Sequence, residues 1–156
     1  MTQHTRDRGT VHDTMVLERI YEAAAARVFA AWADPGVKRD WFTGGDDAGE
    51  YALDFRVGGK EFSRSTAPDG EVYTYEAHYQ DIVLDQRIVY TNHMLRGGDR
   101  ISVSLTSVEF RPDPAGTRLV LTEHGVYLDG LDRPEYRAQG IAEQLEALAR
   151  GLPVAE

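Results

Sequence analysis

Three side chains in strand-like segments could do acid–base chemistry or hold a ligand: Asp81, Tyr90 and Glu123. The short turns between these segments set a register with Asp81 opposite Tyr90, Tyr90 opposite Leu105, and Leu105 opposite Glu123. Apolar residues alternate on the same side of the strands, so this row is predicted on the buried face. Because a buried ionised carboxylate is costly unless paired or neutralised, Glu123 and Asp81 are candidates for a general acid or base, or for partners of a ligand hydroxyl.

Two structural explanations compete with this chemical one. A one-residue bulge would turn either carboxylate to solvent, and an arginine could pair with it instead. We favour these explanations over catalysis, because acids are almost never fully buried without a partner.

The other groups that often do chemistry are less well placed. His78, His93 and His124 fall on the opposite alternation and are predicted on the solvent side or at the rim. No two histidines have the helical spacing of a zinc site, so no metal is expected. Ser102 and Ser104 do not lie in a nucleophile-elbow sequence. The chain has no cysteine, which excludes thiolate metal sites and thiol nucleophiles.

The aromatic residues give a stronger signal than the titratable ones. The chain has eight tyrosines and five phenylalanines, and a core needing only bulk would more often use phenylalanine. Apolar ring faces combined with phenol hydroxyls are typical of a pocket for an aromatic or lipid-like ligand, although core packing is the favoured explanation for any single ring. The residues predicted to line such a pocket are Trp41, Tyr75, Tyr79, Tyr90, Asn92, Met94 and Glu123.

Hydrophobic periodicity predicts the elements that position these residues. Residues 14–21 have the pattern of a strand, residues 23–34 that of an amphipathic helix ended at Asp34-Pro35, and residues 35–42 that of a further helical segment. From residue 50 the apolar period changes to two. Six strand-like runs follow, joined by turns too short for parallel crossovers: 50–57, 60–65, 71–84, 87–95, 100–110 and 117–126.

A long helix is predicted after the last strand. Residues 131–153 carry an apolar stripe at helical spacing, with Asp132 as N-cap and Gly151 and Pro153 as stop signals. The whole order predicts one α+β domain over residues 13–152, with a flexible tail at 1–12 and a short tail at 153–156.

A glycine pair separates the first two runs of the six, in the segment DFRVGG at 54–59. A phosphate-binding loop would open a helix at this point, but Gly58 and Gly59 are followed by a strand. They are therefore predicted to form a type I′ hairpin turn between Val57 and Lys60, because glycine adopts positive φ without a Cβ penalty.

Composition narrows the classes of partner. The formal net charge is −9, with 26 acidic residues against 17 basic ones, which argues against binding nucleic acid or an anionic membrane. No apolar run is long enough to span a membrane, and the polar N-terminus lacks the apolar core of a secretory signal. We expect a soluble cytoplasmic protein without membrane insertion and without a cofactor.

Five segments, in order, carry a family resemblance: AAAARVFAAWADP (23–35), the tryptophan of KRDWF (38–42), DFRVGGKE (54–61), IVLDQRIVYT (82–91) and GTRLVLTEHG (116–125). On these segments the chain resembles the SRPBCC superfamily, also described as START-like or birch-pollen-allergen-like. Within that superfamily it is similar to the group named for the activator of the heat shock protein 90 ATPase. The resemblance implies a helix-grip fold, in which a curved antiparallel sheet wraps around the long C-terminal helix and leaves a cavity between them. Related chains often have a bulky aromatic near Ile141, so the cavity mouth is expected to be wider or differently lined here.

The resemblance implies that the cavity binds a small hydrophobic molecule, such as a lipid, a polyketide or a flavonoid-like aromatic. One alternative is a polyketide cyclase or dehydratase, for which Glu123, Asp81 and Tyr90 are the candidate catalytic residues. The other is an interaction protein that activates a chaperone ATPase. We favour binding over catalysis and leave a homodimer open.

Overall fold

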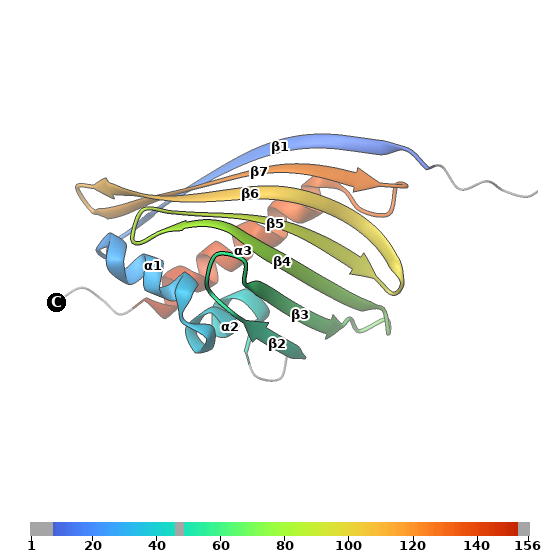
Figure 1. Cartoon of the computed structure of the whole chain (residues 1–156), viewed down its shortest axis with the longest axis horizontal. Coiled ribbons are helices and arrows are strands. Elements are labelled where there is room, and N and C mark those ends of the chain that lie inside the picture. Colours follow the sequence, from blue (N-terminus) through green and yellow to red (C-terminus); the bar gives the residue numbers. More distant parts are fainter. Residues whose placement is uncertain (1–7, 46–48, 153–156) are drawn as a thin grey trace, which may run out of the picture.

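The computed structural model describes residues 8–45 and 49–152, so the predicted tail at 153–156 and most of the tail at 1–12 lie outside the described residues. Seven antiparallel strands form one curved sheet in the order β1-β7-β6-β5-β4-β3-β2 (Figure 1). The strands are β1 (Thr10–Tyr21), β2 (Glu50–Leu53), β3 (Lys60–Thr66), β4 (Val72–Val83), β5 (Arg87–Arg96), β6 (Asp99–Asp113) and β7 (Gly116–Leu128). The helices are α1 (Ala25–Ala33), α2 (Pro35–Thr43) and α3 (Pro134–Gly151). The predicted α+β helix-grip architecture is confirmed.

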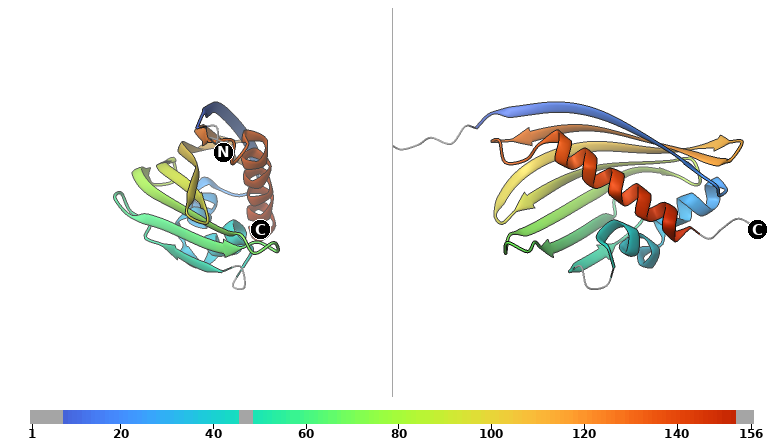
Figure 2. Two further views of the ribbon diagram at one scale, coloured as in Figure 1. Left: turned by 90° about the vertical axis from the view of Figure 1, so that its right-hand side faces the viewer. Right: turned by 180° about the vertical axis from the view of Figure 1, so that it is seen from behind.

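The long helix α3 lies diagonally across the concave face of the sheet, with α1 and α2 at one end (Figure 2). Two hydrogen bonds connect α3 to its neighbours. The Tyr21 hydroxyl of β1 donates to the Leu145 carbonyl (2.9 Å). The Gln144 side-chain amide donates to the Phe42 carbonyl of α2 (2.9 Å). The apolar stripe of α3, which contains Ile141, Leu145 and Leu148, is buried against the sheet.

The helix boundaries follow the capping signals. Asp34 caps α2 by accepting a hydrogen bond from the Val37 amide (3.1 Å), with Pro35 in the first turn and Gly44 at φ 93° after the last. The predicted N-cap of α3 is off by one residue. Arg133 occupies that position, and the Asp132 side chain accepts instead from the Arg133 amide (2.8 Å).

Two boundaries of the sheet differ from the prediction. β1 begins at Thr10, inside the predicted tail, because the long strand β7 supplies a partner for every residue up to the Thr10–Leu128 pair. β2 ends at Leu53 instead of residue 57, so residues 54–59 form a loop longer than a two-residue hairpin.

The glycine pair in this loop is bound to a third strand. The Gly58 amide donates to the Tyr79 carbonyl (2.9 Å), and the Gly59 carbonyl accepts from the Tyr79 amide (3.0 Å). A Cβ at Gly59 would lie 2.1 Å from the Asp54 carbonyl oxygen, so the close backbone approach requires glycine there. The glycines shape the sheet, as predicted, but they do so by extending the β3–β4 ladder beyond Lys60. The predicted type I′ turn is wrong, because only Gly58 has a positive φ.

The predicted strand register is wrong by one residue at β4–β5. Asp85 takes a left-handed φ of 62°, so the turn has three residues and Val83 pairs with Arg87. A bulge between Tyr79 and Asp81 then restores the alternation. The predicted pairings of β5–β6 and β6–β7 are also wrong by one residue, the first because of a bulge between Met94 and Leu95. The observed row across the concave face is Tyr79, Tyr90, Thr106 and Glu123. Leu105, predicted on the buried face, is 45% exposed.

Candidate functional site

A buried ion pair joins the last strand to the last helix. Glu123 of β7 is fully buried, and Arg137 of α3 donates to both of its carboxylate oxygens, from Nε (2.9 Å) and from Nη2 (3.0 Å). The Thr106 hydroxyl donates to the same carboxylate (2.6 Å), and the Asn92 amide donates to Thr106 (2.9 Å). Glu123 is thus held by three neighbours from three elements.

These contacts fix the charge state of the pair. Burial alone raises the pKa of Glu123, but the Arg137 charge and the hydrogen bonds from Arg137, Thr106 and Asn92 outweigh it and lower the pKa. Burial lowers the pKa of Arg137, and the Glu123 charge more than compensates by raising it. Both side chains are therefore ionised at neutral pH.

A second buried ion pair lies between α2 and β3. Lys38 Nζ is 2.8 Å from Glu61 Oε1, and the two side chains are 1% and 0% exposed. The Tyr51 hydroxyl donates to the other oxygen of Glu61. Burial lowers the pKa of Lys38, and the nearby Glu61 carboxylate offsets only part of this effect.

Aromatic rings enclose the lysine. Its ammonium lies 4.9 Å from the Trp32 ring centroid, 5.7 Å from Trp41 and 4.8 Å from Phe42. The Tyr79 hydroxyl is 3.4 Å from both Lys38 Nζ and Glu61 Oε1. The pair therefore fills a region where the family resemblance implied open volume.

Three tyrosines lie between the two ion pairs. Burial, with the Tyr90, Glu61 and Glu123 groups nearby, raises the pKa values of Tyr75, Tyr79 and Tyr90, so all three phenols are neutral donors. The Tyr79 and Tyr90 rings pack edge to face at 5.8 Å. The enclosed void beside Tyr75 and Tyr90 has a volume of only about 10 Å³, which admits one water molecule. The internal cavity expected under α3 is therefore occupied by protein side chains at this point.

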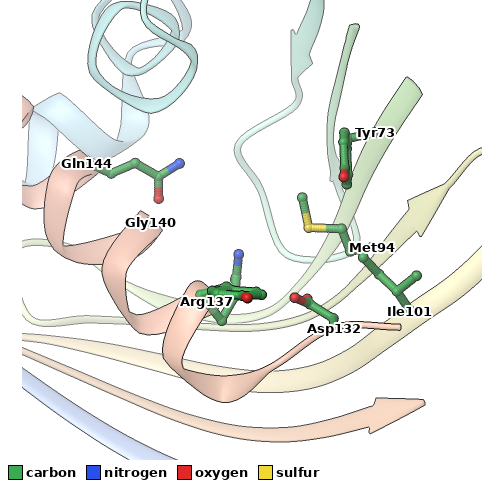
Figure 3. Close-up of a pocket in the computed structure, with 8 residues that line it drawn as sticks. Tyr73, Met94, Ile101, Asp132, Arg137, Gly140 and Gln144 are labelled. Atoms are coloured by element: carbon green, nitrogen blue, oxygen red, sulfur yellow. The ribbon is translucent and has the colours of Figure 1, made fainter. Parts of the chain in front are cut away.

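Open volume lies at both ends of α3. A pocket of about 410 Å³ lies between α2 and the C-terminal end of α3. At the N-terminal half of α3 two pockets share Met94, Arg137 and Gln144, and Figure 3 draws the larger of these two. The larger has a volume of about 220 Å³ and is also lined by Tyr73, Ile101, Asp132, Tyr136 and Gly140. The smaller has a volume of about 160 Å³ and is also lined by Phe42, Thr43, Ser63, Ser65 and Tyr75. We call the two together the α3 cleft.

Arg137 connects the α3 cleft to the buried polar row. Its side chain is 13% exposed, it lines both pockets, and its guanidinium lies 5.7 Å from the Tyr75 ring centroid. Its bonds to Glu123 and Asn92 use Nε and Nη2 and do not engage Nη1. The cleft therefore combines apolar walls with a guanidinium edge, hydroxyls and an amide.

The predicted pocket residues divide into three groups. Met94 and Tyr75 line the α3 cleft, Trp41 and Tyr90 line the 10 Å³ void, and Trp41 also lines the 410 Å³ pocket. The others, Tyr79, Asn92 and Glu123, form the buried network behind them. The structure therefore brings the set together in one region, although only part of it faces open volume.

Asp81 does not belong to this region. The bulge after Tyr79 turns it to the outer side, where its carboxylate pairs with Arg87 (2.6 Å) and both side chains are largely exposed. The predicted row of two carboxylates is therefore wrong, and both structural explanations apply: a bulge displaces Asp81 and an arginine pairs with Glu123.

The histidines lie on the outer side of the sheet as predicted. His93 Nε2 is 3.2 Å from a Glu76 oxygen, and His124 Nδ1 is 3.0 Å from the Thr14 hydroxyl. Within residues 8–45 and 49–152, no three His, Asp or Glu side chains converge as a metal site would require. No helix of the described chain is long and apolar enough to cross a membrane.

Sequence reasoning missed much of the cleft lining and also the charged residues of the Lys38–Glu61 pair. Arg137 and Gln144 lie on the same helical stripe as Ile141 and Leu148, and a polar residue on an apolar stripe is a usable signal. Glu61 lies opposite Leu53, a pairing that the predicted hairpin turn between Val57 and Lys60 does not give. Nothing in the sequence singles out Lys38, whose burial depends on how α2 docks.

A curved antiparallel sheet that grips a long C-terminal helix, with a cleft beside that helix, defines a helix-grip protein of the SRPBCC type. The family model described as Activator of Hsp90 ATPase homolog 1-like protein matches residues 22–152, and the chain belongs to this family. No curated protein matches the chain.

Solved structures share the whole domain. An uncharacterised protein from Rhizobium leguminosarum is 44% identical, with 94% of this chain and 97% of that chain covered and a TM-score of 0.90. The Mll3558 protein from Rhizobium loti is also 44% identical, covering 92% and 99% of the two chains, with a TM-score of 0.87. The CV1439 protein from Chromobacterium violaceum shares the fold at 24% identity, covering 89% and 96%, with a TM-score of 0.73.

Proposed function

We propose that the protein binds a small, largely apolar or aromatic molecule in the α3 cleft. The observation that carries this proposal is the junction of the two pockets at Met94, Arg137 and Gln144, where apolar walls meet a partly buried guanidinium. Burial of apolar ligand surface supplies affinity at roughly 25 cal/mol per Å². The arginine, the amide and nearby hydroxyls fix the ligand's orientation.

The size of the cleft supports a small ligand. The larger pocket, at about 220 Å³, exceeds the roughly 150 Å³ of an apolar cavity that holds benzene. A lipid, polyketide or flavonoid-like ligand would have to extend from one pocket into the other, across Met94.

The alternative function as a cyclase or dehydratase receives less support from the contacts. A general acid needs a proton to give near neutral pH, whereas Glu123 has a lowered pKa and three hydrogen-bonding neighbours. Asp81 lies on the outer side of the sheet, paired with Arg87. The chaperone-activator alternative rests on the family resemblance alone.

Gly140 offers a direct test of the binding site. It lines the larger pocket, and an added Cβ would meet no atom within 4 Å. Gly140→Phe should therefore fill the pocket without straining α3, and Gly140→Ala is the matched control. A thermal-shift screen of neutral aromatics and lipids, with native mass spectrometry for co-purifying molecules, should find ligands for wild type and Gly140→Ala but not for Gly140→Phe. Equal binding to all three proteins, or no ligand for wild type, would sink the proposal.

A further inference from the structure

We infer that the α3 cleft selects a neutral ligand over an anionic one, because its arginine is already neutralised from within the protein. This inference rests on the proposed function and adds a chemical class to it. The ligand's polar group is then an uncharged acceptor, such as a carbonyl, an amide or a phenol, and not a carboxylate.

The first observation is that Arg137 already has a carboxylate partner within the protein. An arginine that recognises a ligand carboxylate usually offers an uncompensated charge and a free bidentate edge. Here the bidentate contact goes to Glu123, a fully buried carboxylate of the same protein, at 2.9 and 3.0 Å. The pair as a unit is neutral, and what it presents to the cleft is a hydrogen-bond donor.

The second observation is the set of charges around the cleft. Asp132 lines the larger pocket itself, so its carboxylate faces any ligand bound there. Burial raises the pKa of Asp132, and the Arg133 amide, Arg137 and Arg96 offset only part of that rise. The Arg133 guanidinium lies 5.8 Å from the Tyr136 ring centroid. Neither Arg96 nor Arg133 lines the two pockets.

Desolvation decides between the two ligand classes. A carboxylate entering the cleft loses water, and only an uncompensated cation would repay that cost. A bound carboxylate would instead compete with Glu123 for Arg137 and lie near Asp132. A neutral carbonyl accepts from Nη1 without disturbing the ion pair. The overall charge of −9 adds to the discrimination against anions.

The test uses two probes of the same shape, 2-naphthamide and 2-naphthoate, titrated calorimetrically into the full-length protein at pH 7.5. Wild type should bind the amide at least about tenfold more tightly than the carboxylate. Glu123→Gln frees the Arg137 charge while keeping the side-chain shape. It should shift the affinity ratio toward the carboxylate by about tenfold or more.

Asp132→Asn provides a second variant that does not disturb the buried pair. It removes the carboxylate that lines the cleft and should shift the ratio toward 2-naphthoate by a smaller factor, about threefold. Gly140→Phe should abolish binding of both probes, which assigns the binding to the cleft.

The outcomes separate this inference from the proposed function. If wild type binds 2-naphthoate as tightly as the amide, or if the ratio is the same in wild type and both charge variants, the inference fails while the binding function stands. If wild type binds neither probe, or Gly140→Phe binds both, the proposed function and the inference both fail.

Discussion

Replacing Lys38 with methionine should destabilise the protein far more than removing an exposed ion pair. Methionine keeps an apolar chain of similar length among Trp32 and Phe42, but it leaves the Glu61 carboxylate fully buried. The remaining donors to Glu61 are the hydroxyls of Tyr51 and Tyr79, which carry no charge.

The expected magnitude follows from the geometry. At the observed 2.8 Å separation, the direct attraction is about 6 kcal/mol at an effective dielectric constant of about 20. Desolvation of both ions cancels much of that, so the intact pair contributes little net stability. Breaking it by removing one partner nevertheless costs about 3–5 kcal/mol, because an unpaired buried charge is left behind. Such a loss is a large share of the roughly 5–15 kcal/mol by which a domain is stable.

The assay is urea unfolding at pH 7 for wild type, Lys38→Met, Glu61→Gln and the double variant. The double variant should recover at least half of the loss, since glutamine still accepts from Tyr51 and no charge is left unpaired. Arg87→Met is the control, because it breaks the exposed pair with Asp81 and should cost about 1 kcal/mol or less. The reasoning is refuted if Lys38→Met costs no more than this control, or if the double variant is no more stable than Lys38→Met alone.

Three further predictions concern the helix, the charge network and the glycine loop. Gly140→Ala should stabilise the protein by about 0.5–1 kcal/mol in urea unfolding, because the added Cβ meets no atom within 4 Å and alanine favours the helix; a loss of stability would contradict the open space beside α3. The lowered pKa of Glu123 means that its stabilising effect is fully present above the ordinary carboxyl value of 4.5 and is lost as pH falls through the lower folded-state pKa. The stability advantage of wild type over Glu123→Gln in thermal unfolding should therefore shrink below pH 4.5, and an advantage that grows in acid would show that the pKa is raised instead. Gly58→Ala should cost about 1–2 kcal/mol through its positive φ alone, whereas Gly59→Ala should cost more because its Cβ would lie 2.1 Å from the Asp54 carbonyl oxygen; equal losses would mean that the loop can relax.

The order of elements could be predicted from the sequence because each carries its own local signal. Asp34, Pro35 and Gly44 mark the ends of α2, and the period-two runs mark the strands. The family resemblance then supplied the packing of α3 on the curved sheet, which no local pattern specifies.

The register could not be predicted from turn lengths alone. It depends on Asp85 adopting a left-handed conformation and on a bulge after Tyr79. Both features are determined by how the strands pack together in the sheet and not by the turn sequence. A second bulge, between Met94 and Leu95, placed Thr106 instead of Leu105 opposite Tyr90, and the bulge after Tyr79 moved Asp81 to the outer side.

The partners of the buried carboxylates could not be predicted from the sequence either. Glu123 and Arg137 are 14 residues apart on different elements, and Lys38 and Glu61 are 23 apart. Their pairing depends on how helices dock against the sheet, so the sequence could suggest that Glu123 needs a partner without naming Arg137.

The most direct test of ligand binding in the α3 cleft uses the methionine methyl groups. The chain has three methionines, of which Met94 lines both pockets and Met15 is buried in the core. In ¹³C-methyl NMR, with the Met94 signal assigned by Met94→Leu, titration of 2-naphthamide should shift the Met94 resonance and leave that of Met15 nearly unchanged. A bound probe that leaves Met94 unshifted, or that shifts Met15 instead, would contradict binding in the cleft.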